Sequence, residues 1–253
     1  MMSNKWVLVT GATGSIGGVI SKELAREGYN LILTGRRTSA LAVLEEMARA
    51  EGVEHVCVSC DLPDYQGLLV KAVGACPNLW GLVHCAAVVN KGWLWERLVE
   101  DWLAEFRTNA EGAYYATKIV AEKLVEQGTG GRIVLMSSIN SFLAYNGRSS
   151  YSASKAAVNG LTRSLAIELG IYGVTVNAIS LGNYVSPMFN SPMSPSALED
   201  VRRHTPTGRL CEGDDVVGLV TFLISERAKQ INGQTIIMDG GFTIYGGIDP
   251  LWA

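Results

Sequence analysis

The sequence predicts an α/β protein in which a doubly wound parallel sheet carries helices on both faces. Three observations support this fold class. Short apolar runs alternate with longer amphipathic segments along the chain. The apolar runs are continuous, as expected of strands that are covered on both faces. A glycine-rich segment, residues 11–17, joins the first apolar run to the first amphipathic segment. Together these features indicate a Rossmann-type sheet built from strand–helix–strand units.

The chain, residues 1–253, is expected to form a single domain. α/β domains of this length commonly fold as one unit. No linker rich in proline and serine, no repeat and no low-complexity tract divides the sequence. Hydrophobic residues make up 48% of the chain, which is enough for a large core.

Seven apolar runs, each bounded by glycine or polar residues, are expected to form the strands. They span residues 6–9, 31–33, 53–59, 82–85, 132–136, 175–179 and 235–238. The helices are expected in the amphipathic segments between them, including residues 16–27, 40–50, 65–75, 101–126 and 151–169. Because strands and helices alternate, the strands should be parallel and joined by right-handed crossovers.

This topology predicts where a ligand binds. In doubly wound sheets, ligands lie beyond the carboxyl ends of the strands, near the point where the strand order reverses. Residues 11–17, 86–88, 137–138 and 181–182 each follow an apolar strand. We therefore expect these four segments to meet in one crevice, although they are far apart in the sequence.

The composition argues against two kinds of partner. The net charge is −3 and the isoelectric point is about 5.7, whereas nucleic-acid binding requires a basic surface. No apolar run approaches the ~20 residues that a membrane helix needs, and the N-terminus lacks the apolar core of a signal peptide. We expect a cytoplasmic protein that binds neither nucleic acid nor membrane.

The five cysteines and three histidines do not suggest a metal site. Cys57 and Cys60 form a Cys-x-x-Cys, but no second pair has zinc spacing. Reduced cysteines are the favoured interpretation, and we expect no bound metal. His84 ends an apolar strand and is expected to be a hydrogen-bonded core residue.

The glycine-rich turn is the first motif with chemical content. It reads Gly11-Ala12-Thr13-Gly14-Ser15-Ile16-Gly17. Such a turn lets backbone N–H groups approach a phosphate, and the positive end of the helix dipole favours negative charge. A glycine turn can be purely structural. Its place after the first strand and before the first helix nevertheless predicts dinucleotide binding.

The second motif is the pair Tyr151 and Lys155, which follows Ser138 by thirteen residues. Residues four apart share one face of a helix, so the phenol and the ammonium point the same way. A phenol has an unperturbed pKa of about 10, and a neighbouring cation would lower it toward the working pH of an acid–base catalyst. Tyr-x-x-x-Lys alone occurs on many solvated helices; the upstream turn gives it weight.

These motifs, in this order, resemble the short-chain dehydrogenase/reductase family. The match is to its short, single-domain branch, which includes 3-oxoacyl-carrier-protein reductases and carbonyl reductases. It extends from residue 6 to residue 242 and includes a late Asp239-Gly240-Gly241. The resemblance implies reversible hydride transfer between a nicotinamide dinucleotide and a carbonyl carbon.

The resemblance also implies catalytic roles for Asn109, Ser138, Tyr151 and Lys155. Tyr151 would protonate the carbonyl oxygen in reduction and act as the base in oxidation. Lys155 would lower its pKa and hold the nicotinamide ribose. Ser138 would donate a hydrogen bond to the same oxygen, with Ser137 as the rival for this role. Asn109 would anchor a water, although an asparagine within a helix often only bonds nearby backbone.

The cofactor-binding residues are implied in the same way. They are Gly11, Thr13, Gly14, Ser15, Ile16, Gly17, Arg36, Arg37, Asp61, Leu62, Ala86, Ala87, Tyr151, Lys155, Gly182 and Val185. Asp61 matches the family position that bonds the adenine; it could equally cap the helix that follows.

The end of the second strand favours NADP(H) over NAD(H). NAD-binding sites place an acidic residue here to accept from the ribose 2′-hydroxyl, whereas this chain has Gly35 followed by Arg36 and Arg37. Guanidinium groups suit a 2′-phosphate because of their fork geometry and permanent charge. Alternatively, the two arginines are ordinary solvated loop charges.

Three departures from the family pattern lie near the cofactor. Residues 84–87 read His-Cys-Ala-Ala where the family usually has Asn-Asn-Ala-Gly. Leu181 stands where proline usually precedes Gly182, and Ser186 lies near the usual position of a threonine. These differences concern packing and ring placement rather than proton transfer.

Three segments are expected to form the substrate pocket: residues 88–98, 139–148 and 183–208, the last a proline-containing lid. The candidate substrate-binding residues are Ser138, Asn140, Tyr145, Tyr151, Tyr184 and Met188. Aromatic and methionine side chains suit an apolar or aromatic ketone. They could instead pack the lid against the body of the protein.

The favoured function is NADPH-dependent reduction of a small ketone, apolar or aromatic, to a secondary alcohol of specialised metabolism. One alternative is a 3-oxoacyl-carrier-protein or CoA reductase, although residues 127–130 and 170–173 lack the basic side chains that such enzymes place near the entrance. Another is an NADP(H)-binding sensor or scaffold without turnover. The resemblance implies a homotetramer or homodimer.

Overall fold

The computed structural model describes residues 4–61, 67–185 and 194–246. Its centre is a parallel sheet of seven strands in the order β3-β2-β1-β4-β5-β6-β7. The strands are β1 (Trp6–Thr10), β2 (Asn30–Gly35), β3 (His55–Ser59), β4 (Leu79–His84), β5 (Gly131–Ser138), β6 (Val174–Leu181) and β7 (Thr235–Met238). The predicted Rossmann-type, doubly wound sheet is confirmed.

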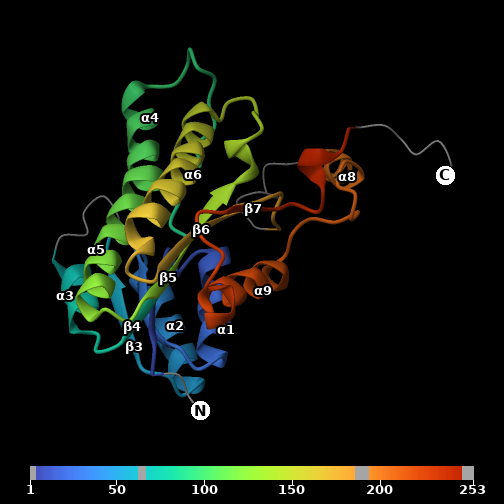
Figure 1. Cartoon of the computed structure of the whole chain (residues 1–253). Coiled ribbons are helices and arrows are strands. Elements are labelled where there is room, and N and C mark those ends of the chain that lie inside the picture. The colour runs from blue at the N-terminus through green and yellow to red at the C-terminus, as the bar shows by residue number, and fades with distance from the viewer. Residues whose placement is uncertain (1–3, 62–66, 186–193, 247–253) are drawn as a thin grey trace.

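The helices cover both faces of this sheet (Figure 1). They are α1 (Ser15–Arg26), α2 (Thr38–Ala50), α3 (Leu68–Ala75), α4 (Val99–Phe106), α5 (Gly112–Gln127), α6 (Ser149–Gly170), α8 (Pro195–Arg203) and α9 (Gly213–Ile224). Helices α1, α2 and α9 lie on one face, and α3, α5 and α6 on the other. None of the helices in the described ranges is long and apolar enough to cross a bilayer.

The sheet separates two hydrophobic cores because successive side chains of a strand point to opposite faces. Val7 and Val9 of β1 pack with α1 and α9, whereas Leu8 between them packs with α3, α5 and α6. All three side chains are fully buried. The continuous apolar runs in the sequence therefore reflect burial on both faces.

One predicted helix, residues 101–126, is not regular. Its helical path runs from Val99 to Gln127, but a π-helical turn, η1 (Arg107–Glu111), separates α4 from α5. Such a turn widens the helix locally and is frequent at functional sites. Here it contains Asn109, whose side chain is fully buried.

Candidate active site

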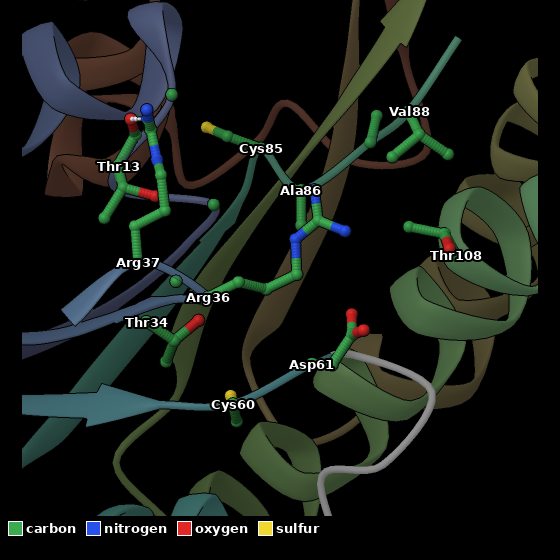
Figure 2. A pocket seen from close by; sticks show the side chains of 14 residues that line it. Thr13, Thr34, Arg36, Arg37, Cys60, Asp61, Cys85, Ala86, Val88 and Thr108 are labelled. Carbon is green, nitrogen blue, oxygen red and sulfur yellow. Dashed lines mark hydrogen bonds between the residues drawn. The ribbon is translucent and has the colours of Figure 1, made fainter. Parts of the chain in front are cut away.

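A cavity of about 250 Å³ lies at the carboxyl ends of the strands near the centre of the sheet. Figure 2 shows the side chains that line it. The lining comes from the segments after β1, β2, β3 and β4, together with η1. Its members are Gly11, Thr13, Gly14, Thr34, Gly35, Arg36, Arg37, Cys60, Asp61, Cys85, Ala86, Ala87, Val88 and Thr108. We call this the cofactor cavity.

The glycine-rich turn brings three backbone segments into close contact at one side of this cavity. Gly11 has φ 63°, and a Cβ there would lie 2.7 Å from the backbone of Ala86. A Cβ on Gly17 would lie 2.3 Å from the carbonyl oxygen of Gly11. Side chains at either position would therefore push the turn away from α1 or from the segment after β4.

Helix α1 begins directly after this turn. Its N-cap residue is Gly14, which has no side chain to bond the first N–H groups. Those groups and the helix dipole are therefore available to an anion. Because Gly14 also lines the cavity, the arrangement fits a dinucleotide phosphate.

The two arginines after β2 differ in their surroundings (Figure 2). The Arg37 guanidinium donates a hydrogen bond of 2.6 Å to the carbonyl oxygen of Thr13, which ties it to the glycine-rich turn. The Arg36 side chain extends across the cavity toward Ala86. Of the two, Arg36 is therefore placed to meet a ligand.

Gly35 has a steric reason to lack a side chain. A Cβ at this position would lie 2.6 Å from Oγ1 and 2.7 Å from Cγ2 of Thr13. An acidic residue here would require Thr13 to move. The absence of the usual ribose acceptor is thus linked to the packing of the turn after β1.

Four lining residues were not predicted from the sequence: Thr34, Cys60, Cys85 and Thr108. The first three adjoin motifs that were predicted, so the strand ends indicated their place, and Val88 was expected in the crevice. Thr108 precedes Asn109 in η1, and only the tertiary structure brings it to the cavity. Asp61, which is predicted to bond the adenine or to cap the helix that follows, also lines the cavity.

The other predicted cofactor residues lie outside the lining of this cavity. Ser15, Ile16 and Gly17 form the first turn of α1. Gly182 follows β6 and packs against Asp239, where a Cβ would meet Asp239 Cβ at 2.6 Å. Val185 is exposed, and its N–H donates to the carbonyl oxygen of Cys211. Leu62 is outside the described residues.

Ser138, the last residue of β5, lies beside Tyr151. Hydrogen bonding from Ser138 is among the influences on the pKa of the Tyr151 phenol. Burial is the largest influence and raises that pKa, whereas Ser138 and the charge of Arg148 lower it. The net shift is upward, so the phenol stays protonated near neutral pH and can donate a proton.

The hydroxyl of Ser137 is used elsewhere, because it donates to the backbone carbonyl of Lys155 at 3.3 Å. Ser138 Oγ instead interacts with the backbone N–H and side chain of Asn140 and with Tyr151. This geometry favours Ser138 over Ser137 as the partner of the phenol.

Lys155 is buried in α6, and its Nζ donates a hydrogen bond of 2.7 Å to the carbonyl oxygen of Met136. The Nζ atom lies 5.7 Å from the centroid of the Tyr151 ring. Burial lowers the pKa of Lys155 to about 8. The lowering of the Tyr151 pKa by Lys155 stays a prediction; in this structure burial raises that pKa, and Arg148 is the cation that lowers it.

Asn109 connects three parts of the site. Its Oδ1 accepts from the N–H of Val88 at 2.8 Å, and its Nδ2 donates to the Val88 carbonyl at 2.9 Å and to Ser154 Oγ at 3.1 Å. Both amide protons are therefore used, and one lone pair of Oδ1 remains. Asn109 fixes the segment after β4 to the helix that carries Tyr151.

The structure places the predicted substrate-binding residues in different surroundings. Asn140 is buried beside Ser138, and Tyr145 is half-buried in the loop before α6. The backbone of Tyr184 pairs with Cys211, and its side chain belongs to a hydrophobic core cluster that also contains Leu181. Substrate binding by Tyr184 stays a prediction. Met188 is outside the described residues.

The structure places the histidines and cysteines as follows. His84 is buried, and its Nδ1 lies 2.9 Å from Thr10 Oγ1. Burial lowers its pKa to about 3. All five cysteines are free thiols. Within the described ranges, His, Cys, Asp and Glu side chains form no group of three or more that could hold a metal ion.

Comparison with known proteins decides the family. Residues 11–243 match the family model described as enoyl-(acyl carrier protein) reductase. The 3-oxoacyl-[acyl-carrier-protein] reductase FabG of Staphylococcus epidermidis is 33% identical over 94% of this chain and 98% of the relative. The chain belongs to the short-chain dehydrogenase/reductase family. It is an oxidoreductase of that family, acting on CH–OH and C=O groups.

Two solved structures of the family are similar throughout. A short-chain type dehydrogenase/reductase from Mycobacterium ulcerans has a TM-score of 0.91 and 29% identity, covering 98% of this chain and 93% of its own. A gluconate 5-dehydrogenase from Burkholderia cenocepacia, in complex with NADP and tartrate, has a TM-score of 0.89 and 26% identity over 95% of each chain. The family to which the chain belongs uses nicotinamide dinucleotides.

Proposed function

We propose that this short-chain dehydrogenase/reductase uses NADPH to reduce a small ketone to a secondary alcohol. The observation that carries the proposal is the position of Arg36. Its guanidinium extends across the cofactor cavity, whereas Arg37 is held by Thr13. The gluconate 5-dehydrogenase that resembles this chain binds NADP.

The residues present fit a dinucleotide carrying a 2′-phosphate. The uncapped first turn of α1 would hold the pyrophosphate, Asp61 would meet the adenine, and Arg36 would pair with the 2′-phosphate. When bound, the nicotinamide supplies the hydride for the carbonyl carbon. Lys155, held by the Met136 carbonyl, would face the ribose next to that ring.

Tyr151 would donate its phenolic proton to the carbonyl oxygen, which gains negative charge as the hydride arrives. Ser138 would hydrogen-bond to the same oxygen, because its hydroxyl already lies against the phenol. Asn109 would hold the segment after β4 in place against α6, because it bonds both Val88 and Ser154. In the reverse direction, the phenolate would accept the proton from the alcohol.

An apolar or aromatic body of the substrate would lie against the segment after β4. Trp93 and Trp95 stack there with ring centroids 5.3 Å apart and planes at 9°. They are 46% and 76% exposed. Two exposed tryptophans are unusual on a free surface and suit contact with an apolar ligand.

The test is NADPH oxidation across aromatic, alicyclic and 3-oxoacyl ketones, with NADH in parallel. We expect turnover with NADPH, and Arg36→Ala should raise the KM for NADPH by roughly 10- to 100-fold while leaving NADH unchanged. Arg49→Ala is the matched control, because Arg49 is exposed and pairs with Glu45 on α2. Equal use of both cofactors by the wild type would contradict the NADP(H) assignment.

A second candidate is reduction of a 3-oxoacyl group on a carrier protein or CoA. The relative from Staphylococcus epidermidis carries that name. The same panel separates the two candidates, because turnover limited to thioester-linked 3-oxoacyl groups would favour the second.

We further propose a homotetramer or homodimer built on α5 and α6. Apolar side chains are exposed on α4, α5 and α6: Leu103, Tyr114 and Ile167. Light scattering of the preparation used for the assays would give its mass, and a monomer would contradict this part.

A further inference from the structure

Beside Ser138 and Tyr151, three buried polar atoms have no hydrogen-bond partner within the described part of the chain. They are Asn140 Nδ2, Asn183 Nδ2 and the Tyr145 hydroxyl. They come from three different segments: the turn after β5, the segment after β6 and the loop before α6. Asn140 and Asn183 are only 5% and 8% exposed. We call these three residues and Arg148 the substrate end of the site.

Unpaired groups of this kind are costly. A buried donor without a partner costs about 1–3 kcal/mol, and most buried polar side chains in folded proteins are satisfied. The side chain of Asn183 is near enough to Tyr145 to lower the pKa of its phenol. Burial has the larger effect, so the net shift of that pKa is upward. Even so, neither Tyr145 Oη nor Asn183 Nδ2 has a partner with hydrogen-bond geometry. A ligand with polar atoms would pair them.

Arg148 adds a positive charge to the same place. It immediately precedes α6, is half-buried, and its guanidinium carbon lies 5.5 Å from the centroid of the Tyr145 ring. Its charge acts on the phenols of both Tyr145 and Tyr151. None of the ion pairs among residues 4–61, 67–185 and 194–246 includes Arg148.

The other charged groups near the two phenols already have partners. Glu105 pairs with Arg97 and accepts from Ser150. The carboxylate of Asp239, whose charge raises the pKa of Tyr145, accepts from the backbone N–H groups of Gly241 and Thr243. Lys155 is bound to the Met136 carbonyl. Arg148 is thus the charge at this end that a substrate can neutralise.

The apolar surface lies next to it. The N–H of Gly92 donates to the carbonyl oxygen of Gly147 at 3.1 Å, so the segment with Trp93 and Trp95 meets the loop with Tyr145 and Arg148. The site therefore combines a reacting centre, an apolar wall and a cation. A purely apolar ketone would leave the cation and the three polar groups unpaired.

We propose that the substrate is an oxo acid: a ketone with an apolar or aromatic body whose carboxylate binds Arg148. Asn140, Asn183 and Tyr145 bond the carboxylate and the polar atoms between it and the carbonyl oxygen at Tyr151. This inference rests on the proposed function and narrows its substrate class. Reduction yields the corresponding hydroxy acid, with the hydride taken by the carbonyl carbon and the proton by its oxygen.

The test uses aryl oxo acids whose carboxylate lies one, two or three carbons from the ketone, each paired with its methyl ester. The wild type with NADPH should prefer one of the acids over its ester by about tenfold or more in kcat/KM. Arg148→Gln should lower kcat/KM for that acid by roughly 10- to 100-fold more than for the ester, mainly through KM, because the ester loses only the effect of the Arg148 charge on the Tyr151 phenol. Arg148→Lys should restore part of the loss, because it keeps the charge.

Arg163→Gln is the control, since Arg163 is exposed on α6, the helix that follows Arg148. If the wild type uses acid and ester equally, or if Arg148→Gln impairs both to the same degree, Arg148 only supports Tyr145 and the proposal is wrong.

A second measurement does not depend on turnover. Calorimetry would follow the binding of an aryl alkanoic acid without a ketone, in the presence of NADP⁺. Arg148→Gln should weaken this binding by the same factor as it lowers kcat/KM. Arg148-dependent binding without turnover of any ketone would support the carboxylate site and overturn the proposed reductase function. If Arg148→Gln binds the aryl alkanoic acid as tightly as the wild type does, the carboxylate site alone is overturned.

Discussion

The cofactor cavity and the substrate end are built in opposite ways. In the cofactor cavity, backbone segments approach one another so closely that Gly11 and Gly17 leave no room for a Cβ. At the substrate end, buried side chains from three loops, among them Asn140 and Asn183, lie beside the reacting groups without partners of their own. One end is defined by main chain, the other by side chains.

This difference has a physical consequence. A backbone-built site can change only if the fold moves, because substitutions at its close approaches displace main-chain atoms. A site made of loop side chains can be altered one residue at a time, because the scaffold beneath it stays in place. Under the proposed function, cofactor binding thus depends on the fold, whereas substrate choice depends on a few polar side chains.

The largest expected effect separates chemistry from cofactor binding. Tyr151→Phe removes the proton donor and should lower kcat by about 10²- to 10⁴-fold, while the Kd for NADPH stays within about twofold. Stopped-flow turnover and fluorescence titration measure the two quantities. Tyr172→Phe, on an exposed tyrosine just after α6, is the control. Near-normal turnover of Tyr151→Phe would remove the phenol from the mechanism.

A smaller effect tests the backbone character of the cofactor cavity. Gly17→Ala places a Cβ 2.3 Å from the Gly11 carbonyl oxygen, and relieving such a contact costs roughly 1–3 kcal/mol. We expect weaker NADPH binding and a lower melting temperature.

Gly18→Ala is the matched change one residue along α1. Its Cβ would lie 3.5 Å from the Ala12 carbonyl oxygen, an ordinary contact. Because alanine favours helix over glycine by about 1 kcal/mol, this variant should be neutral or more stable. Equal behaviour of the two variants would show that the close approach at Gly17 is not a constraint.

The smallest effect concerns a buried pair in the sheet, where His84 of β4 meets Thr10 of β1. Burial lowers the pKa of His84 to about 3 in the folded protein, whereas an unfolded histidine titrates near 6.5. Between about pH 6.5 and pH 3, His84 of the unfolded chain binds a proton that the folded protein does not bind. Stability should therefore fall as pH decreases from about 6.5 toward 3, by roughly 2 kcal/mol at pH 5.

Urea unfolding of the wild type and His84→Asn at pH 7 and pH 5 would measure this contribution. The variant should lose less stability between the two values, whatever its stability at pH 7. His204→Asn, on an exposed histidine beside Asp200, should keep the wild-type dependence. If the stability of His84→Asn has the same pH dependence as that of the wild type, the buried histidine does not cause the loss of stability at low pH.

Several details of the site could not be read from the sequence. Arg36 and Arg37 are adjacent and chemically identical, and only the hydrogen bond to Thr13 distinguishes them. Tyr184 is an aromatic residue in an expected pocket segment, yet its backbone pairs with Cys211 and its side chain belongs to the hydrophobic core. The π-helical turn at Arg107–Glu111 has no pattern of its own and interrupts a segment with regular amphipathic spacing.

The sequence by itself determined the seven strands, the doubly wound sheet and the positions of Gly11, Ser138, Tyr151 and Lys155, because periodicity and short motifs are properties of neighbours along the chain. The tertiary structure decided that Arg36 rather than Arg37 extends across the cavity, that Asn109 joins Val88 to Ser154, and that Arg148 lies beside Tyr145 without a carboxylate. These facts depend on distances between segments that are remote in sequence. Hydrogen bonds and ion pairs depend on differences in distance of a few tenths of an ångström, and a local sequence pattern does not predict such differences.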